Sequence, residues 1–470
     1  MNHEKFLDLV SQSPIVASVQ ASPGSPLEDV ETLYRLAQAS LQNGVRVLRA
    51  QGEDTIRAFK SRFDAPIIGL IKREYGQNPV YITPTEVEVK ALIALGCEVI
   101  ALDGTDRLRP DGSSLGYLIE LIHSAGRLAM ADCDSLESAR FARHCGADLI
   151  GTTLAGYTPA RPATNGPDLA LLRELCDEFG PGVVIAEGRF NEPWQARAAL
   201  QIGASAVVIG GALNDPVKQT AAFVNSAGAR HSHVAAVDIG GTWMRLAVVD
   251  RNLTITSHER HELPESRSQR LKMIHDFCVA HRCNVVGVSS GGTIDPATNT
   301  VVETKPLIPD HLGTNFEFDR IKSYALNDGL ATAWGHAQHP QFAGKRVATL
   351  ALGTGVGCGV VDRGRIMMGP HGEYARINDL QFGEQSFEDQ LGGAALTPNP
   401  TESQKATATE AAKSALDLIK AIVLPDEIVL AGGVGLADWL VLDGAIRSPY
   451  GSDAGIIGAA CLALFPPQIS

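Results

Sequence analysis

The first half of the chain repeats one pattern, in which a short apolar run is followed by a segment of helical length. The runs are rich in β-branched and small residues and lack a clean polar alternation, which is typical of parallel strands buried on both faces. Several intervening segments end in glycine, a common helix stop. Eight β-α units predict a TIM (β/α)8 barrel, with a doubly wound sheet as the alternative. The runs cover 14–20, 45–50, 66–72, 99–105, 127–133, 148–154, 182–188 and 206–212.

Polar residues stand where these predicted strands end. In a TIM barrel the carboxyl ends of the strands build the active site, so we expect these side chains to share one mouth. Charges that converge there perturb one another's pKa, as acid–base chemistry requires. Lys72 beside Arg49 is then a usable base, and the alternative for Lys72 is an ion pair with Asp132 or Glu187. The candidates are Gln20, Arg49, Lys72, Asp132 and Glu187.

Glycines follow the last two predicted strands. Main-chain N–H groups at such glycines approach an anion closely, and this is the usual phosphate site of a barrel. Gly188 follows the seventh run, and Gly210 with Gly211 follows the eighth. We interpret the three as a phosphate site, although a tight turn also explains the glycine pair.

Five segments of this half resemble the N-acylglucosamine-6-phosphate 2-epimerase family, also called N-acetylmannosamine-6-phosphate 2-epimerases. The resemblance implies that Lys72 and Glu187 are catalytic and that Gln20, Arg49 and Asp132 hold the sugar. Gly188 and Arg189 join the substrate-binding candidates. The segments are VQASPGSPL 19–27, IKREYGQNPVYITPT 71–85, ALDGTDRLRPDG 101–112, GTTLAGYTP 151–159 and AEGR 186–189.

The chain departs from the pattern of that family after its glycine pair. The family often reads Ala-Ile-Thr-Arg-Pro there, whereas this chain reads ALNDP over 212–216. Asp215 therefore stands where an arginine is expected, and a basic contact to phosphate is missing. We expect the phosphate to depend on main-chain amides or on another basic side chain.

A different pattern begins after residue 233. Residues 1–223 form the predicted barrel, 224–233 form a small, polar linker, and 234–470 form the second domain. A strand ends in a Gly-Gly-Thr turn, where amides can approach phosphate and Asp238 can hold hydrated Mg²⁺. A second glycine turn and a later glycine pair complete an ATP site. The predicted ATP-binding residues are Asp238, Gly240, Gly241, Thr242, Gly353, Thr354, Gly355, Gly432 and Gly433.

This second half resembles the ROK family of sugar kinases, which share an actin-like ATPase fold. By that resemblance Asn327 binds the sugar, Asp328 is the general base on its 6-hydroxyl, and Gly291 and Glu388 contact the sugar. A carboxylate suits this step because phosphoryl transfer needs mainly positioning and charge neutralisation. The matching motifs are VDIGGT 237–242, GVSSGGTIDP 287–296, LNDGLATAWGHA 326–337, LGTGVGCG 352–359 and GSDAGIIGAA 451–460.

The region 371–393 departs from the ROK pattern. Bacterial members commonly bind a structural zinc there through one histidine and three cysteines, but this segment contains no cysteine. Asp379 stands where the zinc histidine is expected, so we predict no structural zinc. Arg376 stands at a sugar-contacting position, and arginine cannot accept a hydrogen bond. An alternative is therefore an active epimerase beside a kinase half that is degenerate or specific for another hexose.

Composition and net charge exclude some classes of binding partner. A net charge of −13 argues against nucleic-acid binding, and no apolar run is long enough to span a bilayer. We expect a cytoplasmic protein, with no signal peptide, that acts on small sugars and forms a homo-oligomer. None of the eight cysteines forms a CxxC motif, so reduced thiols are expected. With ATP and Mg²⁺ as cofactors, the two resemblances predict phosphorylation of N-acetylmannosamine and epimerisation of the product at C2.

Overall fold

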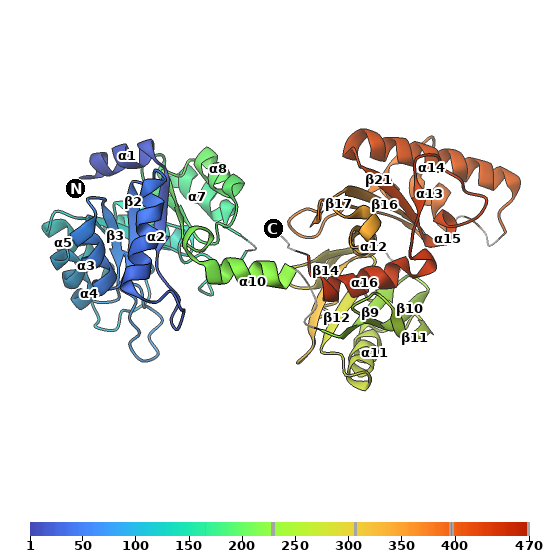
Figure 1. Cartoon of the computed structure of the whole chain (residues 1–470), viewed down its shortest axis with the longest axis horizontal. Helices are drawn as coiled ribbons and strands as arrows, with labels where there is room; N and C mark the ends of the chain where they lie inside the picture. Colours follow the sequence, from blue (N-terminus) through green and yellow to red (C-terminus); the bar gives the residue numbers. More distant parts are fainter. Residues whose placement is uncertain (165, 227–230, 305–307, 394–395, 397–398, 468–470) are drawn as a thin grey trace. The chain divides into compact units, whose positions relative to one another are not determined.

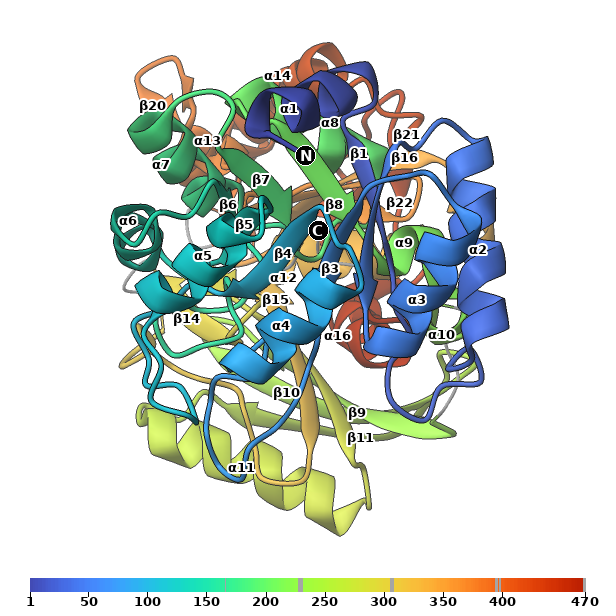
Figure 2. The ribbon, with the colours of Figure 1, turned by 90° about the vertical axis from the view of Figure 1, so that its left-hand side faces the viewer.

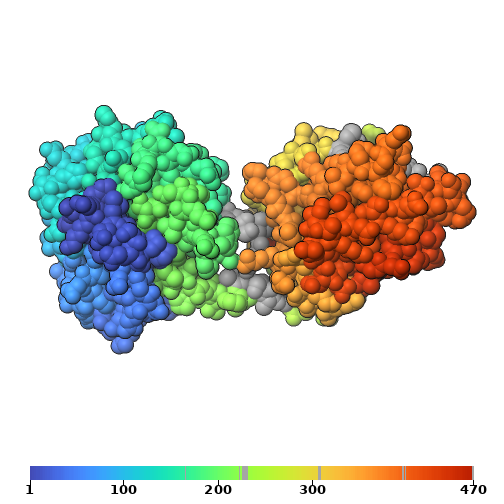
Figure 3. Space-filling view, turned by 90° about the horizontal axis from the view of Figure 1, so that it is seen from above, coloured from blue at the N-terminus to red at the C-terminus, as the bar shows by residue number. Residues whose placement is uncertain are grey.

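The chain folds into two compact units, Met1–Phe223 and Val224–Ile469 (Figure 1). The computed structural model describes all residues except 165, 227–230, 305–307, 394–395, 397–398 and 468–470. Among the described residues, each unit is built from one continuous stretch of sequence, so the colours do not mix between them in Figure 3. Of the predicted linker, residues 224–226 belong to helix α10 (Pro216–Ser226), and 227–230 lie outside the described residues.

The first unit is a closed barrel of eight parallel strands in sequence order, which confirms the predicted fold. Each strand lies inside, or within one residue of, one of the eight apolar runs. Val16 of the first strand pairs with Val208 of the last and so closes the barrel. The strands are β1 Ile15–Val19, β2 Val47–Gln51, β3 Ile67–Leu70, β4 Val99–Asp103, β5 Leu128–Asp132, β6 Leu149–Gly151, β7 Val184–Glu187 and β8 Ala206–Ile209.

Helices surround these strands, as Figure 2 shows. Polar residues start several of them by accepting a main-chain N–H of the first turn: Asp29 accepts from Thr32, and Thr85 with Glu88 forms a capping box. The helices that follow successive strands are α2 Val30–Gln42, α3 Glu53–Arg62, α4 Glu86–Ala94, α5 Leu115–Ser124, α6 Leu136–His144, α7 Leu169–Phe179, α8 Pro193–Ile202, α9 Gly211–Asn214 and α10.

The barrel interior is a packed apolar core and not a channel. Helix α1 (His3–Gln12) precedes the first strand and contributes Phe6 and Val10 to the same cluster as the inward-facing Met130 and Ile185. Each fully buried side chain of this kind stabilises the fold by roughly 1.5–3 kcal/mol. The amino-terminal side of the strands is thus covered, and the polar residues gather at their carboxyl ends.

The second unit contains two five-stranded sheets with the same order of connections. In each, three antiparallel strands are followed by two parallel ones. The resemblance of this half to the ROK family implied an actin-like ATPase fold. The first sheet is β11 Ile255–Glu262, β10 Trp243–Asp250, β9 His233–Ile239, β12 Val285–Ser290 and β15 Lys322–Asn327. The second is β18 Arg365–Ile366, β17 Val356–Asp362, β16 Arg346–Leu352, β21 Glu427–Ala431 and β22 Ile446–Arg447.

Two buried helices lie at the centre of this unit. Nearly every residue of α12 (Asp328–Ala337) and every residue of α16 (Ala454–Leu464) except Gly455 are buried, as is typical of helices enclosed by protein on all sides. They pack closely because Gly335 faces Gly458: a Cβ at Gly335 would stand 2.8 Å from Cα of Gly458. This packing fixes the first residue of α12, Asp328.

The remaining elements complete the second unit. Two short hairpins flank the site described below, and the long helix α14 buries a row of alanines against the second sheet. The strands and helices not yet given are β13 Thr293–Asp295, β14 Thr300–Glu303, β19 Gln381–Phe382, β20 Gln385–Ser386, α11 Arg267–Ala280, α13 Phe387–Leu391, α14 Glu402–Val423 and α15 Gly432–Gly435. Within the described ranges, no helix is long and apolar enough to cross a membrane. All eight cysteines are free thiols.

Candidate active sites

A buried arginine joins the charged residues at the barrel mouth. Arg49, which is 2% exposed, extends from β2 and donates from Nη2 to Oδ2 of Asp132 at 2.7 Å. Its Nη1 lies 3.0 Å from Oε2 of Glu187. Thr153 connects the same two carboxylates, donating to Asp132 at 2.6 Å and lying 3.1 Å from Glu187. Residues from four strand ends therefore form one network.

Lys72 does not take part in that ion pairing. Its Nζ donates to Oε1 of Gln20 at 2.9 Å, so neither Asp132 nor Glu187 is its bonded partner. Lys72 follows β3 by two residues and bridges to Ile82 in an antiparallel hairpin that returns along the mouth. Lys72 is exposed, and its ammonium forms no ion pair with a carboxylate of the described residues, as a group that exchanges protons with a ligand requires.

The two candidate catalytic groups have pKa values shifted toward neutrality. Desolvation and the positive charge of Arg49 lower the pKa of Lys72, while Glu187 and Asp132 oppose the shift. Desolvation raises the pKa of Glu187 to about 7, although Arg49 acts in the opposite direction. A base and an acid with pKa values closer to neutral than usual are suited to proton transfer near neutral pH.

The glycine pair after β8 lies beside a basic side chain that the sequence did not single out. Asp215 accepts the main-chain N–H of Lys218 at 3.1 Å and thereby caps the first turn of α10. The stem of Lys218 lies over Gly211, where a Cβ atom would stand 3.6 Å from its Cδ. The charge of Lys218 also contributes to the lowered pKa of Lys72, but less than desolvation and the charge of Arg49 do.

Arg189 follows Glu187 and Gly188, yet its guanidinium is directed at a neighbouring loop. It donates to the main-chain oxygens of Gly166 and Ala155, both at 2.8 Å, and to Thr164 at 3.1 Å. Its backbone is left-handed, with a φ of 55°. Arg189 thus lies next to the mouth, and its guanidinium donates hydrogen bonds to the loop after β6.

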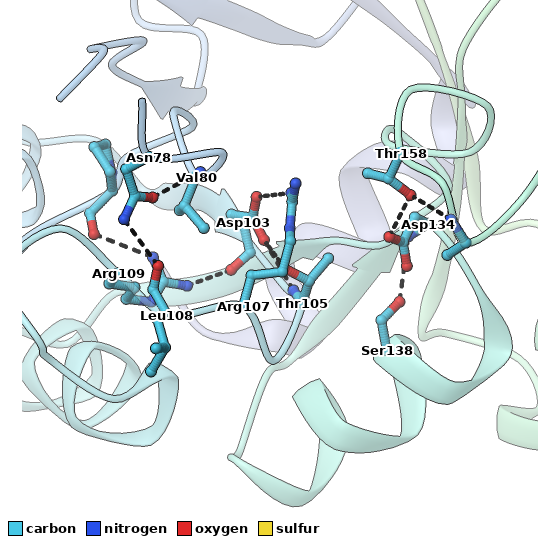
Figure 4. Close-up of polar contacts among 12 residues, drawn as sticks. Asn78, Val80, Asp103, Thr105, Arg107, Leu108, Arg109, Asp134, Ser138 and Thr158 are labelled. Carbon is cyan, nitrogen blue, oxygen red and sulfur yellow. Dashed lines mark hydrogen bonds and ion pairs between the residues drawn. The ribbon is translucent and has the colours of Figure 1, made fainter. Parts of the chain in front are cut away.

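The loops that form the mouth are tied to one another, as Figure 4 shows. Asn78 in the loop after β3 donates to the main-chain oxygen of Leu108 at 3.1 Å. Asp103, at the end of β4, accepts from Arg107 at 2.7 Å. Thr158 after β6 donates to Asp134 after β5 at 2.6 Å. These side-chain bonds hold the mouth in one arrangement before any ligand arrives.

The predicted residues of the second unit line one cavity of about 1150 Å³. They come from loops that are far apart in the sequence and that meet between the two sheets. The lining includes all of the predicted ones: Asp238, Gly240, Gly241, Thr242, Gly291, Asn327, Asp328, Gly353, Thr354, Gly355, Glu388, Gly432 and Gly433.

Asn327 and Asp328 are held at the start of helix α12. Oδ1 of Asn327 accepts the N–H of Gly329 at 2.9 Å, and its Nδ2 donates to the main-chain oxygen of Gly292 at 2.9 Å. Asp328 is accessible from the cavity but surrounded by protein on its other sides. Desolvation, followed by the charge of Asp238, raises the pKa of Asp328 to about 6.

Glycines allow loops of the same cavity to lie close to one another. Gly432 has a φ of 81°, and a Cβ there would stand 2.4 Å from the main-chain oxygen of Leu352, so this position requires glycine. Glu388 accepts the N–H of Val356 at 2.9 Å and so braces the second glycine turn. Glu388 was predicted to contact the sugar, and its carboxylate therefore also bonds the main chain of the predicted phosphate loop.

Asp238, the candidate Mg²⁺ residue, has a basic neighbour. Arg245 on β10 donates to Oδ2 of Asp238 from Nε at 3.1 Å and also from Nη2, and Ser289 donates to Oδ1 at 3.0 Å. The sequence alone did not indicate this pair, because Arg245 lies seven residues away on a strand that reads as ordinary core.

Comparisons with known proteins match both halves. A family model described as "Putative N-acetylmannosamine-6-phosphate epimerase" matches residues 33–229, and the ROK family model matches 234–385. A "Bifunctional enzyme NanE/NanK" from Brucella melitensis is 32% identical and covers 96% of each chain. The chain belongs to the family of bifunctional NanE/NanK enzymes.

A shorter curated relative matches the first half of this NanE/NanK chain. A "Putative N-acetylmannosamine-6-phosphate 2-epimerase" from Clostridium perfringens is 43% identical over 220 residues, which cover 47% of this chain and 99% of the relative. The solved structure of a ROK family glucokinase from Streptomyces griseus is 19% identical in sequence, with a TM-score of 0.43. The match covers 49% of this chain and 99% of the glucokinase chain.

The segment 371–393 of this NanE/NanK chain forms part of the kinase cavity. Arg376 and Asp379 both line it. Arg376 forms a two-point ion pair with Glu303, which sequence reasoning missed because the partners lie 73 residues apart. Across the described ranges, no group of three or more His, Cys, Asp or Glu side chains is arranged to hold a metal ion.

Proposed function

We propose that this NanE/NanK chain phosphorylates N-acetylmannosamine at its 6-hydroxyl and epimerises the product at C2 to N-acetylglucosamine 6-phosphate. The observation that carries the proposal is the pairing of two separate constellations in one chain. Lys72 and Glu187 stand at a barrel mouth, and Asp328 stands among glycine turns in a second unit. Relatives of the first half are named for the 6-phosphate that a kinase of N-acetylmannosamine would produce.

The epimerase step requires removal of one proton from C2 of the sugar and its return to the opposite face. We assign this proton transfer to Lys72, whose lowered pKa and lack of a contacting carboxylate favour exchange. Glu187, with a pKa of about 7, assists ring opening or orients the hydroxyls. Arg49 holds Glu187 and Asp132 in place, and Gln20 positions the ammonium of Lys72.

We place the sugar phosphate of this step at the glycines after β7 and β8. Main-chain amides of Gly188, Gly210 and Gly211 would approach it, and Lys218 would supply the positive charge that an arginine at position 215 would otherwise provide. Lys218 is suited to this because 67% of its side chain is exposed and its contact to Asp215 is loose, at 3.4 Å. Arg49 is already paired with two carboxylates, and Arg189 serves a loop.

The kinase step transfers the terminal phosphoryl group of ATP to the sugar. Asp328 accepts the proton of the 6-hydroxyl, and Asn327 is pre-set beside it by its bond to Gly292. The turns at Gly240–Gly241 and Gly353–Gly355 would contact the phosphates through main-chain amides. Gly432 and Gly433 would border the nucleotide.

Mg²⁺ fits the carboxylates of this cavity. It needs hard oxygen ligands, and it is usually held by one or two carboxylates together with the phosphates of the substrate. Asp238 presents such a carboxylate among the lining residues, with Asp328 and Glu388 in the same cavity. Bound Mg²⁺ would neutralise phosphate charge, while Ser289 and Arg245 orient Asp238.

The two activities are tested separately on the full chain. Solvent deuterium should enter C2 of N-acetylmannosamine 6-phosphate, and ADP release should depend on added N-acetylmannosamine. Exchange without ADP release with any hexose would restrict the function to the epimerase. ADP release that is faster with another hexose would assign the kinase a different sugar.

A further inference from the structure

The ion pair between Arg376 and Glu303 is a fixed feature of the kinase cavity. Nη1 of Arg376 donates to Oε1 of Glu303 at 2.9 Å, and Nη2 contacts the other carboxylate oxygen. Nη2 also lies 3.4 Å from the hydroxyl oxygen of Thr293. Two parallel contacts from a planar guanidinium fix the orientation of a carboxylate better than one contact does.

Tyr374 and Gly292 connect this pair to the proposed base. The guanidinium of Arg376 lies over the ring of Tyr374, 5.8 Å from its centroid, and Tyr374 lines the same cavity as Asp328. Gly292 accepts a hydrogen bond from Asn327 through its main-chain oxygen. A Cβ atom at Gly292 would stand 2.6 Å from the main-chain oxygen of Glu303.

Glu303 has hydrogen-bonding capacity to spare, whereas the acceptor oxygen of Asn327 and one oxygen of Glu388 are already engaged. Arg376 lowers the pKa of Glu303, so the carboxylate stays ionised, and 56% of its side chain is exposed. The acceptor oxygen of Asn327 already receives two main-chain N–H groups. One carboxylate oxygen of Glu388 receives the N–H of Val356. A sugar that offers several hydroxyl donors needs an acceptor of the kind that Glu303 provides.

We propose that Glu303 determines sugar specificity in the kinase half, accepting hydrogen bonds from the acceptor sugar, and that Arg376 is the positioning residue that holds it. The proposal rests on the kinase activity proposed above. The sugar site then still contains a hydrogen-bond acceptor although position 376 is an arginine. The acceptor is the carboxylate of Glu303, which Arg376 holds. A sugar whose hydroxyl or amide donor is directed toward Glu303 is favoured over one that lacks it.

Steady-state kinetics of the full chain with N-acetylmannosamine and ATP test this assignment. Glu303→Gln should raise the KM for the sugar about 10- to 100-fold, because a charged acceptor is lost, and leave the KM for ATP within about twofold. Arg376→Gln should raise the sugar KM less, and Arg376→Lys less again. The double variant Glu303→Gln/Arg376→Gln should resemble Glu303→Gln alone, since both changes act through one carboxylate.

A matched control is the pair Lys345–Glu427, with a contact of 2.7 Å and a partly exposed carboxylate that does not line the cavity. Glu427→Gln should change neither KM. An unchanged sugar KM in an active Glu303→Gln variant overturns the proposal, as does a lower sugar KM in Arg376→Gln, which would mean that the pair obstructs the site. A wild-type chain that phosphorylates no sugar refutes the kinase function itself, and the unchanged KM for ATP shows that the variants are folded.

Discussion

Nη1 of Arg49 lies 3.0 Å from Oε2 of Glu187, and the same guanidinium bonds Asp132 at 2.7 Å. One buried cation therefore serves two carboxylates at the barrel mouth, and Lys72 is left to bond the neutral Gln20. This division of partners explains how a lysine and a glutamate can stand in one site without neutralising each other as an ion pair.

Removal of that cation should destabilise the barrel strongly. Arg49→Met leaves Asp132 and Glu187 buried without their counter-charge, and we expect a loss of about 3–5 kcal/mol in the free energy of unfolding. Urea denaturation of the full chain measures it. Arg140→Met, which breaks the exposed pair with Glu178, is the control and should cost about 0–1 kcal/mol. Equal small losses in both variants would show that Arg49 is not the electrostatic centre of the mouth.

Lys72 should be required for proton exchange as well as for turnover. Lys72→Ala should abolish epimerisation and the incorporation of solvent deuterium at C2, because the proton-transfer group is missing. Lys72→Arg keeps the positive charge but should also be inactive, since a guanidinium does not release its proton near neutral pH. NMR of the sugar phosphate in D₂O reports both processes. Deuterium incorporation that persists in Lys72→Ala would assign the proton transfer to another residue.

Lys218 should act on substrate binding and not on chemistry. Lys218→Ala should raise the epimerase KM for the sugar phosphate about tenfold, because one charged contact to phosphate is lost, and leave kcat nearly unchanged. The effect should shrink as salt concentration rises. Lys90→Ala removes a comparably exposed lysine, paired with Glu86 on helix α4, and should have no effect. A lowered kcat with an unaltered KM would contradict the phosphate role.

The pH dependence of the kinase should report Asp328. Its pKa is raised from 3.8 to about 6, so the base is protonated and inactive below that value, and kcat/KM should fall about tenfold per pH unit below it. Stability runs the other way: the ionised carboxylate is penalised by burial, so Asp328→Asn should gain stability relative to wild type as pH rises through 4 to 6. A kcat/KM that is level down to pH 5 would exclude this residue as the base.

The sequence was sufficient for the features that depend on local pattern. The eight apolar runs located the barrel strands, and the rule that strand ends share one mouth predicted that Arg49, Asp132 and Glu187 lie together. The glycine turns likewise identified the lining of the kinase cavity. In both cases the chemistry lies within a few residues of a recognisable element boundary.

Partners that are distant in sequence were not predictable. Nothing near Glu303 indicates that Arg376 will hold it, and nothing near Arg189 indicates that its guanidinium will serve the loop around Gly166. Lys218 lies in the helix after the glycine pair, where only the three-dimensional path of α9 and α10 brings its stem over Gly211. Ion pairs of this kind leave no local signature, because each partner alone resembles a solvated charge.

The most direct test of the account is one reaction of the full chain with ATP, Mg²⁺ and unphosphorylated N-acetylmannosamine, followed by NMR of the sugars. N-acetylglucosamine 6-phosphate should accumulate in the wild type. Lys72→Ala should stop at N-acetylmannosamine 6-phosphate, and Asp328→Asn should leave the sugar unphosphorylated. If the wild type forms no sugar phosphate, or if Lys72→Ala still yields the epimerised product, two consecutive activities at these two sites are contradicted.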